Sequence, residues 1–463
     1  MNRVAWLLGC WVAVACTTAR DPGVSATPAA AWPAPASAVP PPIPKPAATD
    51  LGDLNMPRAI DLALQNNPDT RTAWLQARQA QAVVGSRRSA YYPEVDLNAS
   101  YTRSRQATQG GRTIFNSTTF GPQLVVTYLL FDFGGRAAQV EEARQALIVA
   151  DFTHNQQIQN VILQTEQAYF GYLDAKSLVD AQSATIKERQ TSVDAAEARH
   201  RAGVATINDV LQARTALSQA QLTYESLGQN LRVFQGTLVT AMGLPVTTRF
   251  TIGTLPSEIP IQEVSTAVES LITQAEQQRP DFAASRSLVQ EAEARVREAR
   301  SAGLPTVGFT ANANRTTFRG VTSGTATPYS FGVAMRFPLF TGWRTQFDLH
   351  AAELGADVAR EGARSFQQRL DLQVWNSYYG LSTAVQRVRT SRDFLSTAQQ
   401  SADMAADRYR SGVGSILDVL TAEAALESAR AQEIQARTDW FLAVAQLAHD
   451  TGSLEAPTQE STR

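Results

Sequence analysis

Short segments of the chain alternate apolar and polar residues, whereas most of the remainder has helical spacing. Between Val95 and Thr102 the odd positions are Val, Leu, Ala and Tyr, and the even positions are Asp, Asn, Ser and Thr. The segments 307–314 and 329–340 repeat this alternation. Strands of about 10 residues with one apolar and one polar face are typical of transmembrane β-barrels. The alternative is a soluble sheet on a hydrophobic core, but the surrounding helical segments offer no globular core for it.

Long helices follow the strands. Residues 134–200 contain no proline, and as one helix they would extend about 100 Å. Gly203 ends this helix, and a second helix over 206–242 returns. The second half repeats the pattern, with helices over 344–409 and 415–449 on either side of Gly412. A shorter helix precedes the strands, over 56–90 in the first half. We expect the two shorter helices to stack end to end beside the long one in an antiparallel coiled arrangement.

The two halves of the chain are copies of one unit. Residues 201–211 read Arg-Ala-Gly-Val-Ala-Thr-Ile-Asn-Asp-Val-Leu, and residues 410–420 read Arg-Ser-Gly-Val-Gly-Ser-Ile-Leu-Asp-Val-Leu. Leu-Phe-Asp-Phe-Gly-Gly-Arg at 130–136 matches Leu-Phe-Thr-Gly-Trp-Arg at 339–344. Because Gly203 and Gly412 are 209 residues apart, the sequence indicates a duplicated large unit and not a short-period solenoid.

These landmarks predict the organisation of the whole chain. Residues 1–15 form a signal peptide, 16–50 a Pro/Ala-rich tether and 456–463 a disordered tail. The first copy spans 51–255 and the second 256–455. The predicted strands cover 94–105 and 119–131 in the first copy, and 306–317 and 328–340 in the second. The predicted fold class is an α+β membrane protein in which a long antiparallel α-helical barrel continues a transmembrane β-barrel.

The first residues indicate export. The apolar run from Val4 to Ala15 is too short to span a bilayer, which takes about 20 residues, and fits a secretory signal. Ala13-Val14-Ala15-Cys16 is similar to a lipoprotein cleavage box, so Cys16 is the predicted acylation site, although Ala13 stands where Leu is usual. Leu7-Leu8-Gly9-Cys10 fits the box better but leaves a shorter apolar run. Cleavage without lipid is the third alternative. The residues that follow Cys16 are Thr17 and Thr18. Neither is the aspartate that retains a lipoprotein at the inner membrane, so the outer membrane is favoured.

Composition excludes several classes of function. With 41 basic and 43 acidic residues the formal net charge is −2, which argues against nucleic-acid binding. Both cysteines lie in the first sixteen residues and the four histidines are scattered, so we expect no metal site and no cofactor. The chain has no Gly-x-Ser-x-Gly, no phosphate-binding loop and no His-Glu-x-x-His. We therefore expect no enzymatic activity.

Four strands cannot enclose a lumen, since the smallest transmembrane barrels have about eight. Open sheet edges cannot face lipid. The protein must therefore complete its sheet with further copies of itself. Two copies would supply eight strands and three would supply twelve, and a water-filled channel favours the larger number.

The duplicated strand and helix unit, the Leu-Phe-Asp-Phe-Gly-Gly-Arg entry to the long helix and the twin Arg-x-Gly-Val…Asp-Val-Leu turns resemble the TolC family of outer-membrane efflux channels. The resemblance covers residues 55–455. It implies a homotrimer with a twelve-stranded barrel in outer-membrane lipid and a helical tunnel across the periplasm. It further implies docking to a periplasmic adaptor (membrane fusion) protein and, through it, to an inner-membrane pump. Lipid-anchored members carry an acylated N-terminal cysteine, as Cys16 would be.

The resemblance also suggests site residues at the two helix turns. The turn residues, expected to dock the adaptor, are Gly203, Val204, Ala205, Thr206, Gly412, Val413, Gly414 and Ser415. Asp418 is expected to line the tunnel mouth, where three copies would form a cation-attracting ring. Thr421 replaces a second ring aspartate, and Tyr409 and Asp209 occupy positions able to form a hydrogen bond that holds the mouth closed. The alternative is that Asp209 and Asp418 only stabilise the starts of their helices.

The predicted function is therefore the outer-membrane channel of a tripartite efflux or type I secretion system, a passive conduit. A lipid-anchored periplasmic coiled-coil adaptor or scaffold is the alternative, but it would not need strands of membrane length. The sequence leaves the cargo open among drugs, metal ions and polypeptides, because the inner-membrane pump selects it.

Overall fold

The computed structural model describes residues 50–108, 113–256, 259, 267–320 and 323–454. The predicted signal peptide, the acylation site Cys16, the tether up to residue 49 and the predicted tail at 456–463 lie outside the described residues. The account below therefore concerns the duplicated part of the chain.

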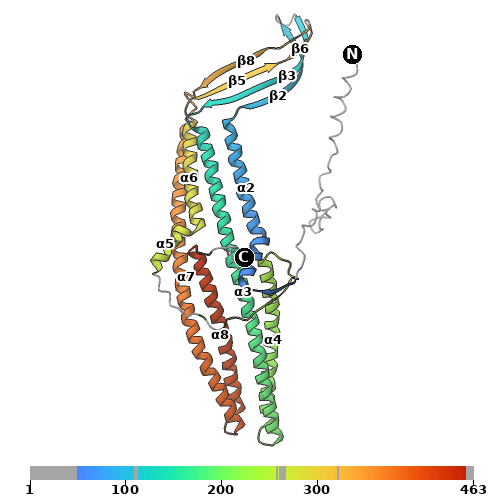
Figure 1. Cartoon of the computed structure of the whole chain (residues 1–463), viewed down its shortest axis with the longest axis vertical. Coiled ribbons are helices and arrows are strands. Elements are labelled where there is room, and N and C mark those ends of the chain that lie inside the picture. Colours follow the sequence, from blue (N-terminus) through green and yellow to red (C-terminus); the bar gives the residue numbers. More distant parts are fainter. Residues whose placement is uncertain (1–49, 109–112, 257–258, 260–266, 321–322, 455–463) are drawn as a thin grey trace, which may run out of the picture. The chain divides into compact units, whose positions relative to one another are not determined.

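Two helical hairpins of equal dimensions form most of the helical part of the described chain (Figure 1). In the first copy α3 (Gly135–Arg201) has 67 residues and α4 (Ile207–Ala241) has 35. In the second copy α7 (Arg344–Arg410) and α8 (Ile416–Asp450) have the same two lengths. The helix α3 packs against α4 and also against α8, so the two copies are joined through α3. None of the described helices combines the length and the apolar character needed to cross a membrane.

The helix before the strands is divided in both copies, which corrects the single helix expected over 56–90. The first copy has α1 (Met56–Asn66) and α2 (Pro68–Arg88), followed by a short 3-10 turn, η2 (Ser89–Tyr91). The second has α5 (Val268–Gln278) and α6 (Pro280–Ser301). Each division falls at a proline, which has no N–H to continue the preceding helix but suits the first position of a new one. Asn67 caps α2 by accepting from the Asp69 N–H at 2.8 Å.

Four long strands form one antiparallel sheet, β2 (Glu94–Thr108), β3 (Thr113–Phe131), β5 (Thr306–Asn314) and β8 (Tyr329–Arg336). They pair in the order β2-β3-β5-β8, and the short strands β6 (Thr316–Arg319) and β7 (Gly324–Ala326) continue beside the far end of β3. The strands of the first copy are longer than predicted. The predicted strand 306–317 is broken at Arg315, and the predicted strand 328–340 ends early at Arg336, two residues before Pro338, which cannot donate to a ladder.

The strand register places the alternating residues in continuous rows. Leu97 pairs with Leu124, Leu124 with Ala313, and Ala313 with Tyr329. The next row consists of Val95, Val126, Ala311 and Phe331. Because side chains alternate along a strand, the polar residues Asn98, Gln123 and Asn314 form a row on the opposite face. The sheet therefore has one apolar face and one polar face, and much of the apolar face is exposed in the single chain.

The largest hydrophobic core lies near the middle of the helices, where α3 and α4 meet a small parallel sheet that was not predicted. This sheet pairs β1 (Asp50–Leu54) with β4 (Arg249–Ile252). Leu238 and Met242 are fully buried there beside Phe170. The Lys176 ammonium donates to the carbonyl of Ile252 at 2.8 Å. Strands of five and four residues carry too little alternation to be predicted.

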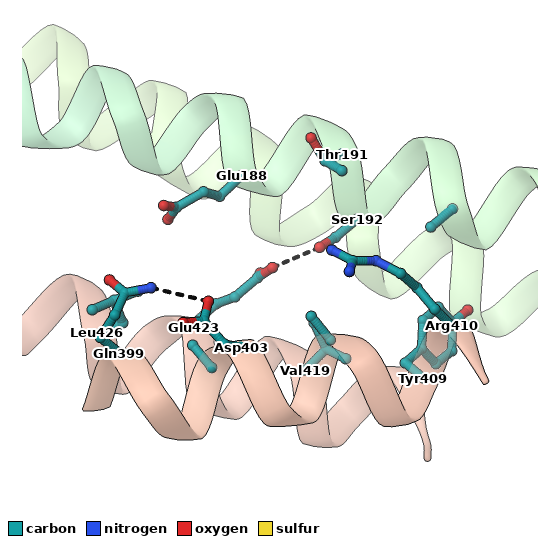
Figure 2. Close-up of a pocket in the computed structure, with 13 residues that line it drawn as sticks. Glu188, Thr191, Ser192, Gln399, Asp403, Tyr409, Arg410, Val419, Glu423 and Leu426 are labelled. Atoms are coloured by element: carbon teal, nitrogen blue, oxygen red, sulfur yellow. Dashed lines mark hydrogen bonds between the residues drawn. The ribbon is translucent and has the colours of Figure 1, made fainter. Parts of the chain in front are cut away.

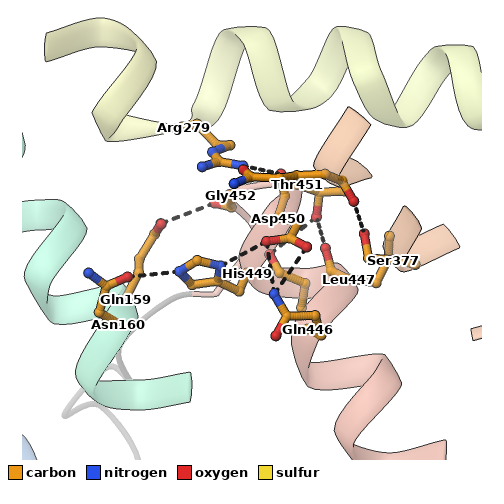
Figure 3. Close-up of polar contacts among 12 residues, drawn as sticks. Gln159, Asn160, Arg279, Ser377, Gln446, Leu447, His449, Asp450, Thr451 and Gly452 are labelled. Carbon is orange, nitrogen blue, oxygen red and sulfur yellow. Dashed lines mark hydrogen bonds and ion pairs between the residues drawn. The ribbon is translucent and has the colours of Figure 1, made fainter. Parts of the chain in front are cut away.

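A polar cluster joins the end of α8 to the first copy (Figure 3). His449 lies between the Asp450 carboxylate, 3.0 Å from Nδ1, and the Asn160 side-chain oxygen, 2.9 Å from Nε2. Arg279, at the start of α6, is buried and pairs with Asp281. Its Nη1 also donates to Gln373 on α7 at 2.9 Å. The His449 contact thus joins the end of α8 to α3, and Arg279 joins the start of α6 to α7.

Candidate functional site: the helical tip

Each long helix ends in a glycine turn of the same backbone form. Gly203 has φ of 74° and Gly412 has φ of 83°, values that favour glycine because it lacks a Cβ. The Val204 N–H donates to the carbonyl of Arg199, and the Val413 N–H donates to that of Arg408, both at 3.0 Å. These are the bonds expected of a helix that ends with a left-handed residue.

The residues after each glycine are accessible. Val204 is 64 % exposed and Val413 is 71 % exposed. Ala205 and Gly414 are partly buried, and Thr206 and Ser415 are exposed. A Cβ on Gly414 would lie only 3.1 Å from the backbone nitrogen of Tyr409, so a larger residue here would need the neighbouring backbone to shift by a few tenths of an ångström. The eight residues predicted at the turns thus form two small exposed loops, one at the end of each hairpin.

Both predicted aspartates lie at the third position of a helix and bond to its cap residue. Thr206 caps α4, with its hydroxyl accepting from the Asp209 N–H at 3.3 Å and donating to the Asp209 carboxylate at 2.8 Å. Ser415 and Asp418 form a reciprocal capping box on α8, each side chain accepting from the other's N–H at 3.2 Å. The helix-start role is therefore present at both sites. It leaves the Asp418 side chain exposed, as is Thr421 one turn later.

Tyr409 is buried, and within the described chain its hydroxyl has no hydrogen-bond partner. The bond to Asp209 that the sequence suggested is therefore not formed inside one chain. Instead, the guanidinium of Arg199 on α3 lies 4.7 Å from the centre of the Tyr409 ring. Burial raises the pKa of Tyr409, the charge of Arg199 opposes this shift and the charge of Asp209 adds to it.

A buried ionic cluster above the tip was not predicted. Arg189 on α3 donates to the Glu423 carboxylate at 2.8 Å and to the carbonyl of Leu420 at 3.2 Å. Ser192 donates to the second oxygen of Glu423 at 2.6 Å, as Figure 2 shows. The Arg189 side chain is 5 % exposed and that of Glu423 10 %. The sequence signal was weak because Arg189 and Glu423 are 234 residues apart.

The helices α3, α7 and α8 surround a cavity of about 270 Å³ between the ionic cluster and Tyr409 (Figure 2). Farther from the tip, Arg430 on α8 forms two hydrogen bonds of 2.8 Å with Glu188 on α3. It also donates to Gln399 on α7 at 3.2 Å. The second hairpin is therefore tied to α3 at several levels.

The fold and the tip together define a class of protein, a duplicated membrane channel made of paired strands and long helical hairpins. The chain matches the family model described as outer membrane efflux protein over residues 59–244 and 271–453. It belongs to that family.

Curated relatives support this assignment. The chain is 28 % identical over 415 residues to protein CyaE of Bordetella pertussis, covering 88 % of this chain and 84 % of that protein. It is 24 % identical over 403 residues to outer membrane protein TolC of Escherichia coli, covering 84 % and 80 %.

Solved structures share the fold. The CmeC outer membrane channel of Campylobacter jejuni has a TM-score of 0.77 at 19 % identity, covering 87 % of this chain and 86 % of that one. The outer-membrane channel OprN has a TM-score of 0.75 at 21 % identity, covering 87 % and 91 %.

The protein is thus the outer-membrane channel component of a tripartite efflux or type I secretion system, and it extends from the outer membrane into the periplasm. The channel prediction, and not the adaptor alternative, agrees with the family.

Proposed function

We propose that the chain acts as a homotrimeric passive conduit in which three sheets close one barrel of twelve long strands, four from each copy. The open sheet carries this proposal. Among the described residues β2 pairs only with β3 and β8 pairs only with β5, so both edges are free. Free edges cannot remain in lipid, because their N–H and C=O groups would lose their hydrogen bonds. Joining β8 of one copy to β2 of the next would satisfy both.

The apolar face of the sheet is then the lipid face, and the polar row of Asn98, Gln123 and Asn314 lines the lumen. Alternation along β8 allows a matched test at neighbouring positions, since Val333 belongs to the apolar face and Ala334 to the polar face. Val333→Arg should destabilise insertion by about 2–4 kcal/mol. Ala334→Arg should insert as the native chain does.

Heat-modifiable migration of outer-membrane extracts measures insertion, and the native mass of the purified channel in detergent measures the copy number. Equal loss of insertion in both variants would contradict the assignment of the faces. A native mass other than three chains would contradict the trimer.

We further propose that the tip performs gating and docking. Around a threefold axis, three Asp418 carboxylates would form a ring that attracts cations, with Thr421 one turn farther along the same helix. Tyr409 and Asp209 would control how the second hairpin moves relative to the first. The exposed turns Gly203–Thr206 and Gly412–Ser415 would receive the periplasmic adaptor, and through it the inner-membrane pump. Their exposed valines and small neighbours support this role.

Cys16 is the proposed site of the lipid anchor. The test is the mass of the mature N-terminal peptide, with Cys16→Ser as the control variant. A peptide that begins at Cys16 and carries acyl groups supports the anchor. Cleavage elsewhere, or an unmodified cysteine, overturns it without affecting the channel proposal.

A further inference from the structure

Arginines continue the apolar face of the sheet beyond its last aromatic row. Tyr101 pairs with Phe120, and two residues farther from the helices Arg103 pairs with Thr118. On its other side Thr118 pairs with Arg319 of β6. Since positions two apart on a strand share a face, Arg103 and Arg319 lie on the same face as Tyr101 and Phe120. Arg105, paired with Asn116, follows one step farther on that face.

The position of this arginine row matches the level of lipid headgroups. Exposed aromatic side chains commonly mark the membrane–water interface of transmembrane strands, and Tyr101 and Phe120 are both exposed. The row lies at the end of the sheet that is directed away from the helices (Figure 1). Because the helices extend into the periplasm, this end belongs to the outer leaflet of the outer membrane.

These positive charges have no acidic residue near them in the sequence. The chain contains no Asp or Glu from residue 97 to 131 or from residue 299 to 347. Those two ranges include every residue of the sheet except the start of β2. The exposed guanidinium groups of Arg103 and Arg319 are therefore available to an anion from outside the protein.

On the other side of the aromatic row from these arginines the apolar face is hollowed. A depression of about 380 Å³ is lined by Leu97, Leu124 and Tyr329, with Arg315 also in its wall. The Arg315 N–H donates to the carbonyl of Pro122 at 3.0 Å. A Cβ on Gly121 would lie 1.7 Å from the Arg315 carbonyl oxygen, so glycine is required for β3 and the β5–β6 junction to approach here. An apolar hollow on the same face as exposed guanidinium groups suits an acyl chain joined to an anionic headgroup.

We propose that this face binds a phosphorylated glycolipid of the outer leaflet, of the lipopolysaccharide class. The phosphates bind Arg103 and Arg319, whose guanidinium groups can each offer two parallel N–H donors to a phosphate. One acyl chain lies over the depression beside Arg315. The inference rests on the proposed insertion of the apolar face in lipid, and it adds a defined lipid partner to that face.

The experiment compares bisphosphorylated lipid A with dephosphorylated lipid A, each titrated into the purified channel in detergent and followed by native mass spectrometry. Near a membrane surface each Arg contributes about fivefold in affinity for anionic lipid. The double variant Arg103→Gln/Arg319→Gln should therefore bind bisphosphorylated lipid A about 25-fold more weakly than the native channel. Arg336→Gln is the matched control, because Arg336 lies on the opposite face at the helix end of β8, and its affinity should be unchanged.

Dephosphorylated lipid A should bind weakly, and equally to all three proteins. In the native channel, 0.5 M salt should weaken the bisphosphorylated complex at least about tenfold, since exposed charges are screened. This measurement needs no variant and remains informative if the double variant fails to assemble.

Equal affinity of the native channel and the double variant for bisphosphorylated lipid A would overturn the proposal. So would equal affinity for phosphatidylglycerol, or displacement by inorganic phosphate at similar concentration, which would assign the site to anions in general. Heat-modifiable migration of every variant shows whether it is inserted, so a loss of lipid binding can be distinguished from a failure of insertion.

Discussion

The two turns at the helical tip share a backbone course but differ in how they are anchored. Three residues before the turn glycine, the first copy has His200, which is exposed, and the second has Tyr409, which is buried under Arg199. The first turn is capped by a threonine and the second by a reciprocal capping box. The second hairpin is also bound to α3 by Arg189 and Arg430. Duplication therefore preserved the course of the turn, while packing buried Tyr409 of the second turn against α3 and left His200 of the first turn exposed.

The largest effect is expected from removing the buried arginine that joins the copies. Arg189→Met would leave the Glu423 carboxylate buried without its cationic partner, which typically costs about 3–5 kcal/mol. The matched control is Arg214→Met in the exposed Arg214–Glu197 pair of the first hairpin, with an expected cost below about 1 kcal/mol. Amide hydrogen exchange of α3 and α8 in the assembled channel measures both as local unfolding free energies. Similar losses would contradict the view that the buried pair between α3 and α8 holds the two copies together more strongly than an exposed pair within one hairpin.

The turn glycines should respond alike, because their backbone conformation is the same. Gly203→Ala and Gly412→Ala each place a Cβ at positive φ, at a cost of about 1–2 kcal/mol. No atom lies within 4 Å of the new Cβ at Gly203, and only Arg199 at 3.8 Å approaches it at Gly412. Exchange protection in the last turns of α3 and α7 is the measurement. A markedly larger cost at one position would show that the two turns are not equivalent in backbone strain.

Replacing the N-cap residues of α4 and α8 should destabilise the two helices by smaller and slightly different amounts. Replacing an N-cap Ser or Thr by Ala costs about 1 kcal/mol. We expect Thr206→Ala to cost more than Ser415→Ala, because it removes two bonds of the Thr206 hydroxyl to Asp209. Ser415→Ala removes only the bond from the Asp418 N–H, and the backbone N–H of residue 415 still donates to Asp418. Exchange protection in the first turns of α8 and α4 tests this order, and the reverse order would contradict it.

The smallest effect on stability, but a direct effect on transport, is expected at the aspartates. Asp418→Asn keeps an oxygen for the Ser415 N–H and loses only the charge–dipole term, about 0.3–1 kcal/mol. If three carboxylates line the mouth, the variant should raise single-channel conductance and lower cation selectivity in a planar bilayer. Asp209→Asn, whose carboxylate accepts from the Thr206 hydroxyl, should change selectivity less. Unchanged cation selectivity in Asp418→Asn would show that Asp418 does not line the tunnel mouth and only stabilises the start of α8.

Much of the fold was predictable because its signals are local. Period-two alternation marked the strands, long proline-free runs marked α3 and α7, and the turn glycines marked the helix ends. The errors also have local causes. The division of α1 from α2 depended on reading Pro68 as a helix start, and the early end of β8 depended on Pro338. The short strands β1 and β4 have too few residues for any periodic signal.

The candidate site was predictable only in part. The turns and Asp418 were found because the duplication repeats them. The contacts among Arg189, Ser192 and Glu423 were not found, because an ion pair between distant segments leaves no pattern in either segment. The expected Tyr409 to Asp209 bond was spatially plausible, but Asp209 bonds to Thr206 and Tyr409 packs under Arg199 instead.

The sequence by itself determined the duplicated unit, the order of strands and helices, and the two faces of each strand, because these depend on residue spacing along one segment. Only the tertiary structure decided which rows cross the sheet, where the arginines lie relative to the aromatic residues, and which of the two turns is buried against α3. Those properties depend on register and on packing between segments hundreds of residues apart, and no local pattern specifies them.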